Sequence, residues 1–159
     1  MSGESIGKYL TFLLGEQCFG VDVSRVEVVL ESMPITRVPK APSHLRGVIN
    51  YRGSVIPVAD IRTRFGEGRS LSGPGSSIIV LQLRFGNDDI TIGMLADTVR
   101  EVVDIDSDRI ERPPEVGAHL DEDIIAGIAR KGDEFIVLLD IDEAFKMEAS
   151  AGERVAESP

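Results

Sequence analysis

Short apolar runs, each ended by glycine, proline or charged residues, recur along the whole chain. Many of these runs are rich in β-branched or aromatic residues, which is typical of strands rather than helices. The pattern predicts strands over residues 9–14, 18–23, 47–49, 54–59, 77–85, 90–95, 99–105 and 135–139. A short helix is predicted over residues 140–147. The pattern therefore indicates a fold that is mainly all-β, with short helices.

Two pairs of the predicted strands are separated by short turn sequences. Residues 15–17 (GEQ) and 50–53 (NYRG) each divide two apolar runs, which predicts two hairpins. Pro57 lies inside the strand after the second turn, and because proline has no backbone N–H we expect it at an edge or a bulge. For residues 26–30 (VEVVL), a half-buried strand and an apolar partner-binding face both fit the pattern.

An internal repeat is the most informative feature of the pattern. A shift of 80 positions places Gly47 on Gly127 and Asp60 on Asp140. The same shift aligns Val48 with Ile128, Ile56 with Ile136, Val58 with Leu138, Ile61 with Ile141 and Phe65 with Phe145. Upstream, a shift of 73 aligns Gly20 with Gly93, Val26 with Val99 and Val29 with Val102. Because the matches keep their order at two constant offsets, we infer a duplication.

The repeat divides the chain into two halves. We expect a flexible N-terminus at 1–8, a first barrel half at 9–65, a Gly/Ser linker at 66–77, a second barrel half at 78–147 and a disordered acidic tail at 148–159. Short strands with closely spaced turn signals are typical of a small antiparallel barrel. A unit of about 60 residues is marginal by itself. The two copies are therefore expected to pack together and to share strands, with the cleft between them as the binding surface.

Composition narrows the possible functions. The net charge is −10, and an acidic protein is poorly suited to nucleic acids or anionic membranes, because binding to them needs clustered cations. Cys18 is the only cysteine, so no internal disulfide can form, and we expect a buried strand residue in a reducing compartment. The sequence shows neither a signal peptide nor a run of about 18 apolar residues. The expected location is therefore the cytoplasm.

Candidate chemistry is sparse. His44 and His119 lie far apart in the sequence without Cys or carboxylate companions at ligand spacing, so no metal site is expected. The chain also lacks the glycine motifs that bind phosphates or dinucleotides, and no cofactor is expected. Asp104, Asp106 and Asp108 alternate, but the segment lacks the glycine and glutamate of a calcium loop. We interpret these aspartates as a solvated turn or a helix start.

Asp60 and Asp140 are the pair of residues that suggests an enzyme. Both end equivalent apolar strands, and two symmetry-related aspartates could share a proton, as in an aspartic peptidase. The residues that follow each aspartate do not form the Asp-Thr/Ser-Gly turn that this chemistry needs. We favour the interpretation that each aspartate caps the helical turn after its strand. A small aspartic hydrolase is kept as a remote alternative.

A long motif and several shorter ones connect these features. Residues 46–62 read RGVINYRGSVIPVADIR, and residues 9–15 (YLTFLLG), 19–23 (FGVDV) and 36–42 (TRVPKAP) accompany them. The matching residues of the second half are Gly93, Asp97, Val99, Val102, Gly127 and Ile128. On these residues the chain, from about Tyr9 to Met147, resembles the CheW family of bacterial chemotaxis coupling proteins.

The resemblance implies two packed SH3-like five-stranded barrels, in agreement with the repeat. It also implies a non-catalytic adaptor that couples the cytoplasmic tips of methyl-accepting chemoreceptors to the regulatory domain of a CheA-type histidine kinase, in two-component signal transduction. Such a protein would be a monomer in isolation and cytoplasmic, recruited to inner-membrane receptor arrays without inserting into the membrane. The main alternative is a CheW-like adaptor of a sister chemosensory pathway, such as twitching motility or surface sensing.

The motif matches also suggest partner-binding residues. Arg52, Asn50 and Gly53 form the predicted hairpin tip, where an exposed arginine can anchor a partner. Gly47 would permit close backbone approach, and Arg46 would lie beside it as a rim charge. Apolar partner contacts are expected from four valines, namely Val26, Val29 and Val99 near the seam between the halves, and Val28.

One departure from the family pattern concerns Arg52. The family often has Val-x-Glu-Ile after the first hairpin, and the acid of that motif would be placed to pair with the arginine at the tip. In this chain Val28 takes that place and the acid is Glu27. Because side chains alternate along a strand, we expect Glu27 to point to the opposite face. Arg52 would then be left available to a partner.

Overall fold

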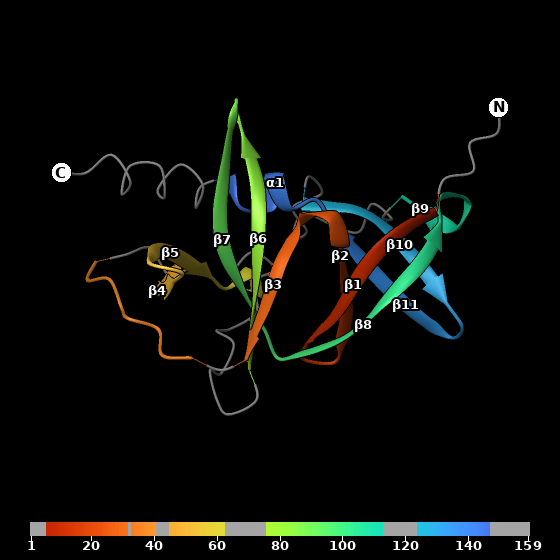
Figure 1. Ribbon diagram of the computed structural model, residues 1–159. Helices are drawn as coiled ribbons and strands as arrows, with labels where there is room; N and C mark the ends of the chain where they lie inside the picture. The colour runs from red at the N-terminus through yellow and green to blue at the C-terminus, as the bar shows by residue number, and fades with distance from the viewer. Residues whose placement is uncertain (1–5, 32, 41–44, 63–75, 113–123, 147–159) are drawn as a thin grey trace.

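The computed structural model describes residues 6–31, 33–40, 45–62, 76–112 and 124–146 (Figure 1). Its strands are β1 (Ile6–Leu14), β2 (Gln17–Asp22), β3 (Val26–Glu31), β4 (Leu45–Tyr51), β5 (Ser54–Ala59), β6 (Ser77–Phe85), β7 (Asp88–Ala96), β8 (Thr98–Asp106), β9 (Ile110–Glu111), β10 (Ile125–Lys131) and β11 (Glu134–Leu139). The helix α1 (Ile141–Ala144) follows β11, and 3₁₀ turns at Val23–Arg25 (η1) and Ser107–Arg109 (η3) precede β3 and β9. The predicted fold class, mainly all-β, is confirmed.

The strands form two sheets, and each sheet draws strands from both halves of the sequence. The six-stranded sheet has the order β8-β1-β2-β11-β10-β9, and the five-stranded sheet has the order β3-β6-β7-β5-β4. Figure 1 shows the five-stranded sheet on the left and the six-stranded sheet on the right. The hairpin β1-β2 thus belongs with strands of the second half, whereas β6-β7 belongs with strands of the first half.

The positions of the strands along the chain agree with the predicted duplication. Hairpin β10-β11 starts, turns and ends 80 residues after hairpin β4-β5, and each hairpin has a bulge near its first residue. In the parallel pairings, Val58 lies opposite Gly93 and Leu138 lies opposite Gly20. Each of these hairpins therefore completes its barrel with a hairpin from the other half. The duplication is confirmed, and the two copies exchange strands.

Three groups of buried side chains hold the sheets together. One group contains residues of both sheets and joins them; we call it the seam cluster, and it includes Phe12, Ile79, Leu81, Met94 and Phe145. The other two groups fill the six-stranded and the five-stranded barrel. In β6, Ile79 and Leu81 face the seam cluster, whereas Ile78 and Val80 face the barrel interior. Because both faces of β6 are buried, its sequence is a continuous apolar run instead of an alternating one.

The five-stranded sheet curls until its outer strand meets the chain that precedes it. The N–H of Thr36 donates to the carbonyl of Val48 (2.9 Å), and the N–H of Val48 donates to the carbonyl of Thr36 (2.8 Å). Pro57 departs from the expectation of an edge or bulge position, because β5 is an interior strand. The parallel ladder between β5 and β7 begins only at Val58, so Pro57 lies just outside it. A proline is tolerated there because no ladder hydrogen bond requires its N–H.

Several smaller expectations can be compared with the structure. β1 begins at Ile6, inside the predicted flexible N-terminus, because residues 6–8 pair with β8. Cys18 is buried, as expected. Asp106 accepts a hydrogen bond from the N–H of Asp108 and caps η3, which confirms the predicted helix start. Most of the predicted linker, the predicted tail, His44 and His119 lie outside the described residues.

Candidate protein-binding site

The β4-β5 hairpin ends in a two-residue turn formed by Arg52 and Gly53. Both residues have positive φ, 52° and 82° respectively, which is the pattern of a type I′ turn. The side chain of Asn50 accepts a hydrogen bond from the N–H of Gly53 (3.1 Å), and this bond fixes the turn. An arginine at positive φ is unusual, since asparagine and glycine adopt this conformation at lower cost. The predicted hairpin tip is confirmed, and Arg52 is exposed at its end.

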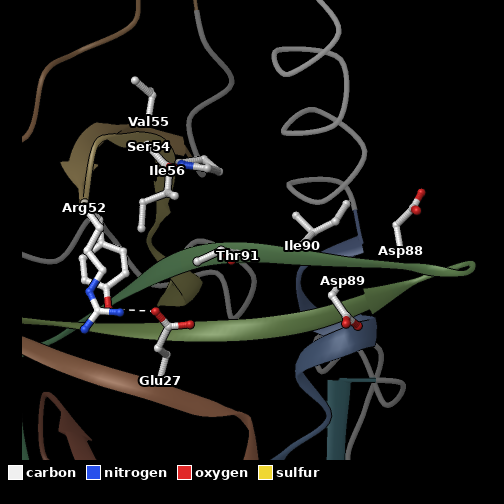
Figure 2. A pocket seen from close by; sticks show the side chains of 11 residues that line it. Glu27, Arg52, Ser54, Val55, Ile56, Asp88, Asp89, Ile90 and Thr91 are labelled. Atoms are coloured by element: carbon white, nitrogen blue, oxygen red, sulfur yellow. Dashed lines mark hydrogen bonds between the residues drawn. The ribbon is translucent and has the colours of Figure 1, made fainter.

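The side chain of Arg52 lies over a small polar network (Figure 2). Its guanidinium carbon is 5.4 Å from the centre of the Tyr51 ring. The hydroxyl of Tyr51 donates to Oε2 of Glu27 (2.7 Å), and Nε2 of Gln82 donates to Oε1 of Glu27 (2.6 Å). These residues come from β4, β3 and β6, so the network links both outer strands of the five-stranded sheet.

The hydrogen bonds of the network set the acidity of Glu27. The bond from Tyr51, the bond from Gln82 and the nearby positive charge of Arg52 together lower the pKa of Glu27. The bond to Glu27 in turn raises the pKa of the Tyr51 hydroxyl. Glu27 is thus a carboxylate, and Tyr51 a neutral donor, at any physiological pH.

The expectation that Glu27 points away from the hairpin tip was wrong. β3 pairs Val26 with Leu81 and Val28 with Val80, so Glu27 is the extra residue of a β-bulge. A bulge interrupts the simple alternation of side chains along a strand and redirects the residue within it. Glu27 therefore lies on the same side as Tyr51 and Gln82. There the positive charge of Arg52 helps to lower the pKa of Glu27.

An open groove runs from this network along the hairpin to the start of β7 (Figure 2). Its volume is about 530 Å³. Arg52 and Glu27 lie at one end and Asp88 and Asp89 at the other, and Val55 is among the apolar residues that line the groove. The side chain of Val55 is 59% exposed, which is unusual for a valine in a strand. The groove combines an apolar surface with charges of both signs, as protein-binding sites do.

Two of the predicted site residues support the hairpin from inside. Arg46 was expected to be a rim charge, but its side chain is only 13% exposed, and its Nη1 lies 3.6 Å from Oδ2 of the buried Asp60. The carboxylate attracts the guanidinium inward, because a buried charge requires a partner. Gly47 is also buried, and a Cβ there would lie 2.3 Å from the carbonyl oxygen of Thr36. Its close backbone approach, predicted from the sequence, thus occurs within the barrel.

The four predicted valines fall into two groups, away from the hairpin tip. Val26, Val29 and Val99 pack against the seam cluster. Val28 packs against the interior of the five-stranded barrel. All four are partly buried, and residues 26–30 lie in strand β3, while the partner contacts of the valines remain a prediction.

Asp60 and Asp140 each have local partners on different sheets. The side chain of Asp60 accepts from the N–H of Arg62 (3.1 Å), and that of Asp140 accepts from the N–H of Glu143 (3.3 Å) at the start of α1. The capping interpretation is confirmed. Asp60 is buried while Asp140 is exposed, so the two carboxylates do not share the common environment that an aspartic-hydrolase pair needs. Among the described residues, no group of three or more His, Cys, Asp or Glu side chains could hold a metal ion.

A second groove at the equivalent place of the other barrel escaped the sequence reasoning. It has a volume of about 390 Å³, and Phe135, Val137 and Gln17 help to line it. Phe135 is the repeat equivalent of Val55 and is 48% exposed, with the guanidinium of Arg130 5.0 Å from the centre of its ring. The sequence did contain a signal for this second groove, because the offset of 80 residues maps the β4-β5 hairpin onto the β10-β11 hairpin. Two barrels, each with an open groove beside its hairpin, are an arrangement suited to a protein-binding scaffold.

Comparison with known proteins identifies the family of this scaffold. Residues 8–149 match the family model of the CheW-like domain. The chain is 27% identical to the chemotaxis protein CheW of Klebsiella aerogenes over 152 residues, which cover 95% of this chain and 89% of the relative. It is 28% identical to protein FrzA of Myxococcus xanthus over 127 residues, which cover 80% and 77% of the two chains.

A solved structure agrees with these matches. The scaffolding protein TtCheW from Thermoanaerobacter tengcongensis superposes with a TM-score of 0.78 at 34% identity, covering 89% of this chain and 88% of that one. The chain belongs to the CheW family, and it is a chemotaxis adaptor. In the described part of the chain, no helix is long and apolar enough to cross a membrane.

Proposed function

We propose that the protein couples the cytoplasmic tips of methyl-accepting chemoreceptors to the regulatory domain of a CheA-type histidine kinase, without catalytic chemistry of its own. It would act in the cytoplasm as a monomer that joins receptor arrays at the inner membrane. The observation that carries the proposal is the hairpin tip, where Arg52 is presented at the mouth of an open groove on a barrel of the CheW family. An adaptor needs two binding surfaces, and the two repeat-related grooves offer them.

Within this proposal the predicted site residues take different roles. Arg52, Asn50 and Gly53 form the contact surface at the hairpin tip. Arg46 and Gly47 hold the hairpin against the barrel from inside, through Asp60 and Thr36 respectively. Val26, Val29 and Val99 contribute a partly exposed apolar border of the seam, and Val28 contributes a partly exposed apolar side chain beside the five-stranded barrel.

The test of coupling is formation of a ternary complex. The kinase regulatory domain is titrated into a preformed complex of this protein with receptor tips, and the species are separated by mass. We expect all three components to migrate together, because distinct surfaces bind the two partners. Stoichiometric displacement of the receptor by the kinase would contradict the coupling role.

The same titration with Arg52→Ala tests the site. Both residues carry a Cβ, so the substitution leaves the backbone strain of the turn unchanged and removes only the guanidinium. We expect the affinity for one partner to fall about tenfold or more, since arginine anchors at interfaces contribute about 2 kcal/mol, and the melting temperature to stay nearly constant. Arg109→Ala is the matched control, because it removes one exposed positive charge from η3 of the other barrel. Equal effects of the two substitutions would show that Arg52 has no specific role.

A second candidate function is an adaptor of a sister chemosensory pathway. It is favoured by the match to FrzA, because this chain is 28% identical to FrzA and 27% identical to the Klebsiella CheW. The proteins that co-purify with this chain from its native cell distinguish the two. Recovery of a kinase and receptors that control flagellar motility supports the first candidate, and recovery of those of twitching or surface sensing supports the second.

A further inference from the structure

We propose that Tyr51, Glu27 and Gln82 are positioning residues that hold the Arg52 guanidinium ready for a partner. This inference rests on the proposed function of Arg52 and deepens it. Glu27 and Tyr51 also line the groove, and the role proposed here for the network is to order the side chain that anchors the partner.

The contacts show how the ordering would work. Glu27 is held by two short hydrogen bonds, one from the Tyr51 hydroxyl (2.7 Å) and one from the Gln82 amide (2.6 Å). The first bond fixes the Tyr51 ring, and the ring supports the guanidinium of Arg52 through a cation–π contact at 5.4 Å. The chain of contacts therefore runs from β6 through β3 and β4 to the hairpin tip.

The donors of Arg52 stay available in this arrangement. An arginine has five N–H donors, and among the described residues none of those of Arg52 makes a hydrogen bond or an ion pair within 4.0 Å. A direct bidentate pair with Glu27 would have occupied two of these donors. The Tyr51 hydroxyl binds the Glu27 carboxylate instead. The carboxylate stays near enough to attract the Arg52 guanidinium without taking up its N–H donors. A partner carboxylate can therefore bind two of the free N–H groups at once, or a backbone carbonyl can accept from them.

The gain for binding is entropic. Arginine has a large rotamer entropy, and ordering the side chain before association lowers the cost of binding. The backbone at Arg52 contributes as well, because its left-handed conformation fixes the direction in which the side chain leaves the turn. Loss of the network would leave Arg52 in place but mobile.

The experiment combines a double-mutant cycle with a direct measurement of order. Tyr51→Phe keeps the aromatic ring and removes only the hydroxyl. The ring thereby loses the hydrogen bond to Glu27 that holds it in place, with little change in side-chain volume. We expect Tyr51→Phe to weaken binding of the kinase regulatory domain or the receptor tips about three- to tenfold. Combined with Arg52→Ala, it should add nothing further. Glu27→Ala should reproduce the effect of Tyr51→Phe, and Tyr9→Phe, in the other sheet, is the matched control.

The order of Arg52 is read in the free protein from the ¹⁵N relaxation of its Nε–H group. We expect a rigid Nε–H in the wild type and in Tyr9→Phe, and a mobile one in Tyr51→Phe and Glu27→Ala. An equally rigid Arg52 in Tyr51→Phe, or a loss of affinity that is additive with Arg52→Ala, would overturn the positioning role. Unchanged affinity in Arg52→Ala alone would instead overturn the proposed function of Arg52, and the relaxation data would still decide the positioning role.

Discussion

Asp142 shows how a single charged residue connects elements that are distant in the sequence. Its Oδ2 accepts from Nη2 of Arg25 (2.6 Å), and its Oδ1 accepts from Nη1 of Arg25 (3.1 Å) and from the N–H of Arg84 (2.9 Å). The carboxylate thereby joins α1 to η1 and β6. Burial by itself would raise the pKa of Asp142, but the hydrogen bonds and charges of the two arginines outweigh it, and the pKa is lowered from 3.8.

The lowered pKa predicts an acid-dependent contribution of Asp142 to stability. In the folded state the group releases its proton more readily than in the unfolded state, so its contribution is present above pH 3.8 and is lost as the pH falls through the lower folded pKa. We expect Asp142→Asn to reduce the free energy of unfolding by about 1 kcal/mol at pH 7, a value discounted because the side chain is 32% exposed. The difference from wild type should shrink as the pH falls below 3.8 and passes through the lower pKa of the folded state.

Urea unfolding over this pH range measures the difference. Asp104→Asn serves as the control, since the pair of Asp104 with Lys8 is exposed and contributes little. Wild-type and Asp142→Asn curves that stay parallel down to the acid end would contradict the prediction.

At the scale of elements, irregularities in the strands decide what the barrels can present. The bulge in β3 turns Glu27 toward the hairpin network, and the bulges in β4 and β10 lie beside Gly47 and Gly127. At both glycines a Cβ would collide with the preceding chain, 2.3 Å from the carbonyl oxygen of Thr36 and 2.5 Å from Cγ2 of Ile110. The equivalent bulges thus let each barrel close tightly around its hairpin.

The closure at β4 predicts a large cost for Gly47→Ala. The new methyl group would clash with backbone, which cannot move aside as a side chain can, and the φ of 152° is unfavourable for alanine. We expect a loss of about 3 kcal/mol or more in the free energy of unfolding, from overpacking and backbone strain together.

Gly132→Ala separates the two contributions. Gly132 also has positive φ (64°), but its Cβ position is open, so only the strain of about 1 kcal/mol should appear. Chemical denaturation of both variants provides the comparison. Similar losses for the two would show that the contact with Thr36 is not the reason for the glycine at position 47.

The two barrels form one body at the scale of the whole molecule. The seam cluster buries side chains from both sheets, and Arg62, after β5, pairs with Asp97, whose carboxylate also accepts from the N–H of Gly15 in the β1-β2 turn (2.7 Å). Because the hairpins are exchanged between the halves, neither sheet is complete without chain from the other half. The shared core and exchanged hairpins therefore join the two grooves within one body, which fits the proposed coupling of two partners.

Shared strands and a shared core predict a single unfolding transition. The chain has no tryptophan and two tyrosines, Tyr9 in the six-stranded sheet and Tyr51 in the five-stranded sheet. Tyr51→Phe leaves only the fluorescence of Tyr9, and Tyr9→Phe leaves only that of Tyr51, so each variant reports on one sheet. We expect fluorescence and far-UV circular dichroism to give the same urea midpoint within each variant, because cooperative domains unfold in one step. A fluorescence midpoint separated from the dichroism midpoint in either variant would show that the sheets unfold independently.

What the sequence by itself determined is local or repetitive. The strands, the NYRG turn, the capping aspartates and the 80-residue offset depend on period-two patterning, turn chemistry and order along the chain, all of which can be seen in the residues. The family resemblance rests on the same kind of information, a contiguous motif from Arg46 to Arg62.

Only the tertiary structure decided which segments meet. The exchange of hairpins between the halves, the inward turn of Arg46 toward Asp60 and the placement of Glu27 beside Tyr51 all join residues far apart in sequence or depend on register. A one-residue bulge reverses the face of a side chain, and its position is set by pairing with β6, which no local pattern of β3 contains. Long-range register, and not residue type, is thus the physical reason why the hairpin network could not be derived from the sequence.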